Sequence, residues 1–458
     1  MTRIYRETLG STTVDSSKAE QGRDARDTSL TNAPAAGQEA HMKSGPDGEE
    51  LVVIVPETNK DSATYDGIDW CGERVTKEIL AQVKRLKDEE GKIVTRFSIT
   101  GYSLGGLIAR YVAGCLAQKG FFQTVQPVNF STVATPHLGQ IRYQTFFSKV
   151  FAFLGPRMLS RTGEQLYTSD DWAESGRPLL DVMTDPGRIF YQTLSTFAQV
   201  RFYANTVNDR TVPYMTAAVE TSDPFRDHTF NGIKIEMDEE YSSVIASFTP
   251  SDVPKPKPPP PTLFSRMWFK NVKSFKIPLP PVLQFKFPGN ILVLILIPIL
   301  LPAVLGLVVF RISLDNRKSR SRLRLLEKDE SYRERLVHAI GRVERSIEDA
   351  AVDFMDDPGR EQTSLLQADG SSPATASSSA SQEPGSEAPK LQSVDVLLPL
   401  QHIIVQTLNA LPNLKKHLVF VDPVTNSHAV IIARDVKRFK HHELGQGVLR
   451  HLADNFIM

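Results

Sequence analysis

The sequence is poor in cysteine, has no excess of charge of either sign, and lacks a leader-like apolar run at its start. The only two cysteines in 458 residues are Cys71 and Cys115, too few for a disulfide framework and without zinc-type spacing. We therefore expect a reducing compartment inside the cell, and neither a metal nor another cofactor. Lysine plus arginine and aspartate plus glutamate each total 53, so the overall charge gives no reason to expect a nucleic-acid partner. Without a signal-peptide-like run, secretion is not expected.

What the sequence does contain is a short motif around Ser103. Residues 101–105 read Gly-Tyr-Ser-Leu-Gly and fit the pattern G-x-S-x-G, with a strand-like run before them and a helix-like stretch, 106–118, after them. This strand, turn and helix form the nucleophile elbow of α/β-hydrolases, which exposes a serine hydroxyl above the sheet. We expect glycine at 101 and 105 because a Cβ atom at either position would collide with the neighbouring strand or helix. The context favours a nucleophile at Ser103 over a glycine-rich turn that carries serine by chance.

The segments around this motif alternate between strand and helix patterns. Short apolar runs at 51–55, 128–133 and 199–205 predict strands, and an apolar face of helical period predicts a helix over 72–87. The alternation predicts an α/β fold with a doubly wound, mostly parallel sheet of the α/β-hydrolase type. Residues 141–195 look helical and carry several aromatic side chains, including Trp172, and both a substrate lid and ordinary core packing are compatible with them.

A serine nucleophile needs a base to accept its proton and an acid to orient that base. In α/β-hydrolases the chain order is serine, acid, histidine, and the acid and the histidine each follow a strand. Asp209 fits the acid because it comes soon after the strand predicted at 199–205. Asp185 and Asp223 also lie downstream of the serine, but neither follows so clear a strand. A purely structural Asx turn is the alternative for Asp209.

His428 is the best candidate for the base. It ends a polar loop, 422–428, that directly follows a strand-like run at 417–421. His228 competes because it lies closer in the sequence to the candidate acid. A histidine without such a context is more often structural than catalytic, and the strand and loop before His428 favour the catalytic interpretation.

The negative oxygen of an acyl-transfer intermediate needs at least two hydrogen-bond donors. The backbone N–H of Leu104, the residue after the serine, is expected to supply one. The second donor normally comes from a loop after an earlier strand, often bearing His-Gly. No such motif precedes Leu51.

A run of about twenty apolar residues, 291–310, is long enough for a membrane segment. A single crossing would separate the serine and the acid from the histidine, which is incompatible with a catalytic triad. Pro298 and Pro302 would break or kink a helix here, and basic residues flank the run on both sides. These features favour a membrane-associated hairpin that enters and leaves by one face, with a single span and a buried core helix as alternatives.

Changes in composition divide the chain into segments. They are a disordered tail (1–48), the first part of the hydrolase core with nucleophile and acid (49–252), a Pro/Lys-rich linker (253–290), the hydrophobic membrane segment (291–310), a basic helical segment (311–360), a disordered low-complexity insertion (361–390) and the second part of the core with the histidine (391–458).

Several motifs in this order resemble those of the fungal putative serine esterases, α/β-hydrolases that include lipid-droplet phospholipases and monoacylglycerol-lipase-like proteins. The motifs are Thr-Tyr-Asp-Gly-Ile at 64–68, Gly-Glu-Arg-Val at 72–75, Gly-Tyr-Ser-Leu-Gly-Gly-Leu-Ile-Ala-Arg-Tyr at 101–111, Thr-Pro-His-Leu-Gly at 135–139, Asn-Asp-Arg-Thr-Val-Pro at 208–213 and Ser-His-Ala-Val-Ile-Ile at 427–432.

The resemblance implies a nucleophile at Ser103, an acid at Asp209 and a base at His428. It also implies lipid ester substrates and an intracellular location at a lipid surface, on lipid droplets or the endoplasmic reticulum. Members of the family begin with a strand and a loop of the His-Gly-Leu-Trp-Gly type, which this sequence lacks. We therefore expect a sheet that is incomplete at its N-terminal side.

These features predict a serine lipase or esterase that hydrolyses phospholipid or acylglycerol esters through an acyl-enzyme on Ser103. The main alternative is a weak or inactive hydrolase-like membrane tether that lacks a complete oxyanion hole. An acyltransferase or thioesterase that uses the same three residues is a third interpretation.

Overall fold

The computed structural model describes residues 12–14, 48–143, 155–156, 159–174, 176–251, 289–328 and 396–458. Most of the expected tail, nearly all of the expected linker and the whole of the expected low-complexity insertion lie outside these residues, as does the second half of the basic segment. The segment boundaries drawn from composition therefore stay predictions.

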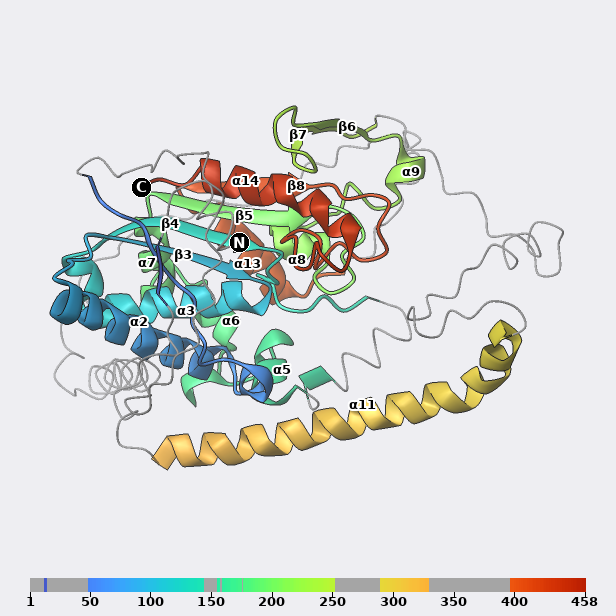
Figure 1. The fold of residues 1–458 in the computed structure, drawn as a ribbon, viewed down its shortest axis with the longest axis horizontal. Helices are drawn as coiled ribbons and strands as arrows, with labels where there is room; N and C mark the ends of the chain where they lie inside the picture. Colours follow the sequence, from blue (N-terminus) through green and yellow to red (C-terminus); the bar gives the residue numbers. More distant parts are fainter. Residues whose placement is uncertain are drawn as a thin grey trace, which may run out of the picture.

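Four parallel strands form the central sheet, in the order β3-β4-β5-β8. Their carboxyl ends lie within two residues of one another, since Tyr102 pairs with Val133, Val133 with Tyr203, and Asn205 with Val419. The loops that follow the strands consequently emerge at one edge of the sheet (Figure 1). The strands are β3 (Arg96–Tyr102), β4 (Gln126–Val133), β5 (Gln199–Asn205) and β8 (Leu414–Val419).

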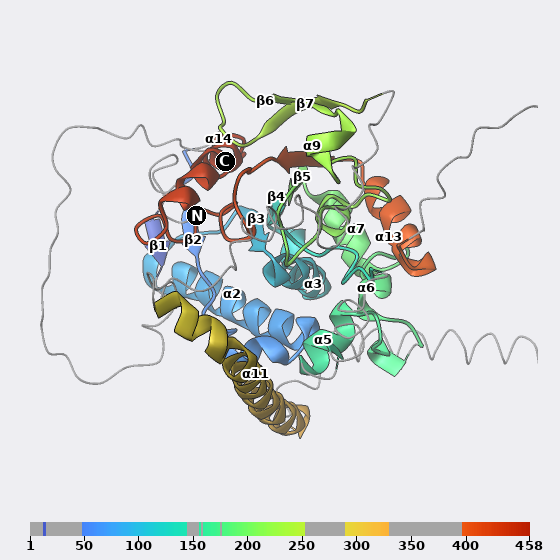
Figure 2. The same ribbon diagram turned by 90° about the vertical axis from the view of Figure 1, so that its right-hand side faces the viewer.

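Helices cover both faces of this sheet (Figure 2). On β5, Phe202 and Ala204 are buried in a core that includes helices α2, α3 and α13, whereas Tyr203 belongs to a second core that includes α14. This alternation along one strand is what a sheet buried on both faces requires, and it confirms the expected α/β architecture. The helices are α2 (Ile68–Glu90), α3 (Leu104–Gln118), α7 (Ile189–Thr196), α13 (Pro399–Asn409) and α14 (Gln446–Asp454).

The short strand β2 (Val52–Ile54) pairs in parallel with β1 (Thr12–Val14) and forms a separate two-stranded sheet. The sequence predicted β2, but it also placed Thr12–Val14 in a disordered tail. Among the described residues, β3 is an edge strand of the central sheet, because β2 is not hydrogen-bonded to it.

The segment expected to be either a lid or core is packed as core where the structure describes it. Trp172 is fully buried and its ring contacts the rings of Tyr111, on α3, and Phe190, on α7. The segment also holds α5 (Ser160–Leu166) and α6 (Leu179–Val182). Residues 144–154, which carry several of its aromatic side chains, lie outside the described part.

Besides β1, two more strands were not predicted from the sequence. The antiparallel pair β6 (Lys234–Met237) and β7 (Ile245–Thr249) lies beside the end of β8, where Val244 bridges to Val419. Next to it, the strand expected over 417–421 is shifted to Leu414–Val419. The chain leaves the sheet after Val419 because the N–H group of Phe420 donates to the carbonyl of Ser243 instead.

The apolar run lies in a single long helix, α11 (Gly289–Lys328), along the outside of the core (Figure 1). The sequence predicts that Pro298 and Pro302 break or kink a helix here, and they do not break it, because α11 continues through both. The sequence also predicted a membrane insertion at 291–310. In the part of the chain that the structure describes, no helix combines the length and apolarity needed to cross a membrane.

Candidate active site

Ser103 lies in the sharp turn between β3 and α3. Its backbone has φ 54° and ψ −128°, a strained conformation for a residue with a side chain. A Cβ atom on Gly101 would lie 2.4 Å from the carbonyl oxygen of Gly105, so the turn requires glycine at position 101. The local geometry therefore fits the elbow that the sequence predicted.

The expectation that position 105 requires glycine is wrong, because the close approach occurs at position 106. A Cβ atom on Gly105 would meet nothing within 4 Å, whereas one on Gly106 would lie 2.0 Å from Oγ1 of Thr135. The close approach is between α3 and the loop after β4, where the Thr135 hydroxyl also donates to the carbonyl oxygen of Ser103. The Thr-Pro-His-Leu-Gly motif thus begins with a residue that supports the turn.

The structure brings Ser103, His428 and Asp209 into one hydrogen-bonded line. Nε2 of His428 lies 3.0 Å from Oγ of Ser103, and Nδ1 of His428 lies 2.9 Å from Oδ2 of Asp209. The three residues follow β3, β8 and β5, respectively, at the same edge of the sheet. This is the geometry of nucleophile, base and orienting acid.

The carboxylate of Asp209 is almost completely buried and fully engaged. Oδ1 accepts hydrogen bonds from the N–H groups of Thr211 and Val212, while Oδ2 accepts one from the side chain of Asn205 and faces His428. The Asx turn that the sequence offered as an alternative is present, on the oxygen that does not face the histidine. The turn fixes the carboxylate so that its other oxygen points at Nδ1.

The loop that carries His428 is tied to the loop that carries Asp209. The Ser427 hydroxyl donates to the carbonyl of Val207, and the Ser427 N–H donates to the carbonyl of Asn208. The His428 N–H donates to the side chain of Asn426. The two loops are therefore held together by backbone groups as well as by the imidazole.

Tyr102 also contacts His428, and this residue was not predicted from the sequence. Its ring lies against the imidazole, with ring centroids 5.1 Å apart, and its hydroxyl donates to the carbonyl of His428 at 2.9 Å. The guanidinium of Arg434 lies 5.3 Å from the centroid of the Tyr102 ring. Burial raises the pKa of the Tyr102 hydroxyl to about 12, so the hydroxyl remains a donor at neutral pH. The feature of the sequence that could have pointed to Tyr102 is its position in the elbow motif, directly before Ser103.

The competing residues are engaged elsewhere. Asp185 pairs with Arg177 at 2.7 Å, and Asp223 accepts hydrogen bonds from the two backbone N–H groups that follow it in the chain. His228 lies 3.6 Å from Asp422. The structure places none of the three in the line of hydrogen bonds at Ser103.

Leu104 begins α3, so its N–H group belongs to the helix end whose amide groups have no partners within the helix. A second donor was expected in the loop after an earlier strand. In the loop after β2, the N–H groups of Glu57 and Thr58 donate to the carboxylate of Glu78. These amide groups are therefore used to hold α2, and the N–H of Leu104 stays the predicted oxyanion donor.

His137, in the Thr-Pro-His-Leu-Gly motif, is structural. It is fully buried, stacks on Phe202 with ring centroids 3.9 Å apart, and lies 2.9 Å from the hydroxyl of Thr132 through Nε2. Burial lowers its pKa well below the usual value, so it is neutral.

Part of the chain is similar in sequence to known proteins. A putative lipase of Schizosaccharomyces pombe is 32% identical over 190 residues, which cover 40% of this chain and 24% of that protein. The putative lipase ROG1 of Saccharomyces cerevisiae is 31% identical over 172 residues, which cover 37% of this chain and 24% of that protein. The match thus spans about a quarter of the length of each relative. Residues 35–223 match the model of the putative serine esterase (DUF676) family, which confirms the family resemblance expected from the motifs.

Proposed function

We propose that this protein is a serine hydrolase that cleaves carboxylic esters of lipids through an acyl-enzyme on Ser103. The observation that carries the proposal is the line of hydrogen bonds from Ser103 through His428 to Asp209. The match to serine esterases and the names of the fungal relatives support the same reaction class.

In the proposed reaction, His428 accepts the hydroxyl proton of Ser103 through Nε2 while Oγ attacks the acyl carbonyl. Asp209 holds the imidazole through Nδ1 and stabilises the imidazolium that forms. The N–H of Leu104 donates to the negative oxygen of the tetrahedral intermediate. His428 then protonates the leaving alcohol, and a water molecule, activated by the same imidazole, releases the fatty acid and frees Ser103.

The proposed substrates are phospholipid or acylglycerol esters at a lipid surface inside the cell, such as a lipid droplet or the endoplasmic reticulum membrane. The names of the relatives, which are called lipases, support a lipid ester. The apolar run at 291–310, with basic residues on both sides, supports a lipid surface.

A second candidate function is a hydrolase-like tether with little or no turnover. It is favoured by the loop after β2, whose N–H groups bind Glu78 instead of being free for an oxyanion. Loss of one oxyanion donor from a complete hole costs about a hundredfold to a thousandfold in kcat. A reactive Ser103 without measurable ester turnover would favour the tether.

Labelling with a fluorophosphonate probe tests the enzyme proposal directly. The folded parent protein is expected to become labelled, and Ser103→Ala is expected to abolish the labelling. Ser98→Ala is the matched control, because Ser98 lies on the same strand and its hydroxyl bonds to Asn129. Absence of labelling in the folded parent, or labelling that survives Ser103→Ala, would overturn the proposal.

A further inference from the structure

The C-terminal half of α11 has two different faces. Ser319 and Leu323 are buried and Arg322 is half-buried, which places these residues on the side that packs on the core. Most of the exposed positions between and around them carry positive charge. The exposed cationic residues, which we call the cationic face, are Arg311, Arg317, Lys318, Arg320, Arg324 and Lys328.

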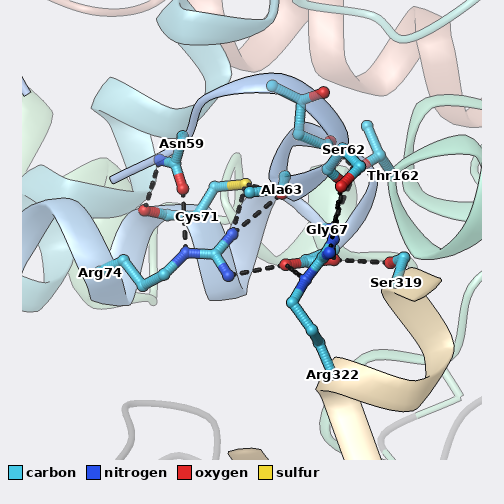
Figure 3. Close-up of polar contacts among 11 residues, drawn as sticks. Asn59, Ser62, Ala63, Gly67, Cys71, Arg74, Thr162, Ser319 and Arg322 are labelled. Atoms are coloured by element: carbon cyan, nitrogen blue, oxygen red, sulfur yellow. Dashed lines mark hydrogen bonds and ion pairs between the residues drawn. The ribbon is translucent and has the colours of Figure 1, made fainter. Parts of the chain in front are cut away.

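The inner face is attached through one buried carboxylate (Figure 3). Asp66, which is fully buried, accepts hydrogen bonds from the Ser319 hydroxyl at 2.6 Å and from Nη2 of Arg322 at 2.8 Å. Arg322 also donates to the hydroxyl and the carbonyl of Ser62, at 3.1 and 2.7 Å. We call Asp66, Ser319 and Arg322 the latch.

The core does not depend on the latch to compensate the charge of Asp66. Nη1 of Arg74, on α2, donates to Oδ2 of Asp66 at 2.7 Å. Arg74 is itself held by the side chain of Asn59 and the carbonyl of Ala63. A buried carboxylate that lost Arg322 would therefore keep one hydrogen-bonded cation, and the core should stay folded.

The cationic face is continuous with exposed apolar side chains. Leu307 and Phe310 are more than half exposed, and Leu314 and Leu325 are also exposed. Arg317 and Arg320 lie in this half of the helix. Of the acidic residues there, Asp315 is the only one whose side chain the structure describes, and it is half-buried. Cations next to exposed apolar groups fit a layer of anionic lipid, which offers negative headgroups above acyl chains. A nucleic acid would bind the cations but would not bury the exposed apolar side chains.

The views agree on where α11 lies. It runs along the outside of the core, and its amino-terminal end, yellow in Figure 1, projects beyond the core on the side to which the strand arrows point. That side is the edge of the sheet at which the loops of Ser103, Asp209 and His428 emerge.

We propose that the cationic face of α11 binds an anionic lipid surface, and that the latch fixes this face to the core so that the core is held there in one orientation. The binding surface stands on the charges, the exposed apolar side chains and the latch, and needs no catalysis. The consequence for catalysis rests on the proposed hydrolase function.

Two arginines on α11 separate the parts of this proposal, since Arg320 points outward and Arg322 points at Asp66. The full-length chain and the variants Arg320→Gln and Arg322→Gln are mixed with vesicles of phosphatidylcholine and with vesicles in which part of the phosphatidylcholine is replaced by phosphatidylserine. Hydrogen exchange at the backbone of residues 61–65 reports whether the latch is closed, because Ser62 and Asp66 hold Arg322 there.

Phosphatidylserine is expected to tighten binding of the parent protein, and Arg320→Gln is expected to weaken binding to these vesicles about fivefold, without a change in exchange at residues 61–65. Arg322→Gln is expected to raise that exchange. Equal binding to both vesicle types, or an Arg320→Gln variant that binds as tightly as the parent, would overturn the lipid surface. Unchanged exchange in Arg322→Gln would overturn the latch.

Turnover separates a failure of this proposal from a failure of the hydrolase. Arg322→Gln is expected to keep the parent activity on a water-soluble ester and to lose activity on an ester embedded in phosphatidylserine vesicles. Equal loss on both substrates would contradict a role in orientation. Vesicle binding and hydrogen exchange need no turnover, so they stand even if neither ester is cleaved.

Discussion

At the scale of single residues, the elbow is decided by close approaches between backbones. The sequence pattern treats the glycines at 101 and 105 as equivalent. In the structure, only Gly101 lies where a side chain would strike backbone atoms, at the start of α3. Gly105 faces open space, and Gly106 carries the second close approach through Thr135.

Alanine substitutions at Gly101 and Gly105 should therefore differ sharply. Gly101→Ala is expected to lower the free energy of unfolding by more than about 3 kcal/mol, because backbone atoms cannot move aside easily. Gly105→Ala, in the first turn of α3, should change it by less than about 1 kcal/mol. Thermal unfolding of the two variants measures the difference. Equal destabilisation would contradict the packing described for the elbow.

Tyr102 offers a second test at this scale, because its hydroxyl and its ring act on His428 in different ways. Tyr102→Phe keeps the ring and loses the hydrogen bond to the His428 carbonyl, so kcat/KM for a soluble ester should fall about fivefold. The kcat/KM of Tyr102→Ala should fall further, because the imidazole also loses its contact with the tyrosine ring. Tyr191→Phe, at a half-buried position on α7, is the control and should match the parent. A Tyr102→Phe variant as active as the parent would exclude a positioning role for the hydroxyl.

At the scale of elements, α14 is attached to the sheet through the half-buried His417 and the buried His451. His417, on β8, and His451, on α14, have ring centroids 4.5 Å apart, and Nδ1 of His451 lies 2.9 Å from the Tyr203 hydroxyl. Burial, together with the nearby His451, Arg201 and Lys415, lowers the pKa of His417 to about 3. Burial also lowers the pKa of His451, against the opposing effect of Asp238 and Asp454.

This arrangement predicts a loss of stability in acid. Below about pH 6.5 the unfolded chain binds a proton at His417 that the folded chain does not bind until about pH 3. The free energy of unfolding should therefore fall by up to about 1.4 kcal/mol for each pH unit between these values, and the contribution is fully present above pH 6.5.

Thermal unfolding of the parent and of His417→Phe across this pH range measures the effect. The variant keeps an aromatic ring against Tyr203 but has no titrating group, so its stability should depend less on pH. His441→Phe changes an exposed histidine and should leave the slope unchanged. A slope in His417→Phe as steep as in the parent would assign the acid sensitivity to other groups.

At the scale of the whole molecule, the sequence was informative where function depends on local order along the chain. Ser103, Asp209 and His428 each lie just beyond a strand, and parallel strands bring such positions together at one edge. The structure places the three side chains within hydrogen-bond reach of one another.

The features that the sequence did not predict depend on contacts between distant segments. The support of His428 by Tyr102 joins positions 326 residues apart, and the contact between Ser319 and Asp66 spans 253 residues. No local pattern encodes which partner a tyrosine or a buried aspartate will meet. The hairpin of β6 and β7 was missed for a related reason, because packing can override local preference.

The position of β8 in the sequence, far after β3 and β5, also has a consequence for biosynthesis. His428 follows this last strand, 219 residues after Asp209, whereas the nucleophile and the acid follow strands made much earlier. A chain still growing on the ribosome therefore carries the serine and the carboxylate without an imidazole to join them. Under the proposed function, hydrolysis requires a chain that extends at least to residue 428, and a chain terminated before it would lack the base.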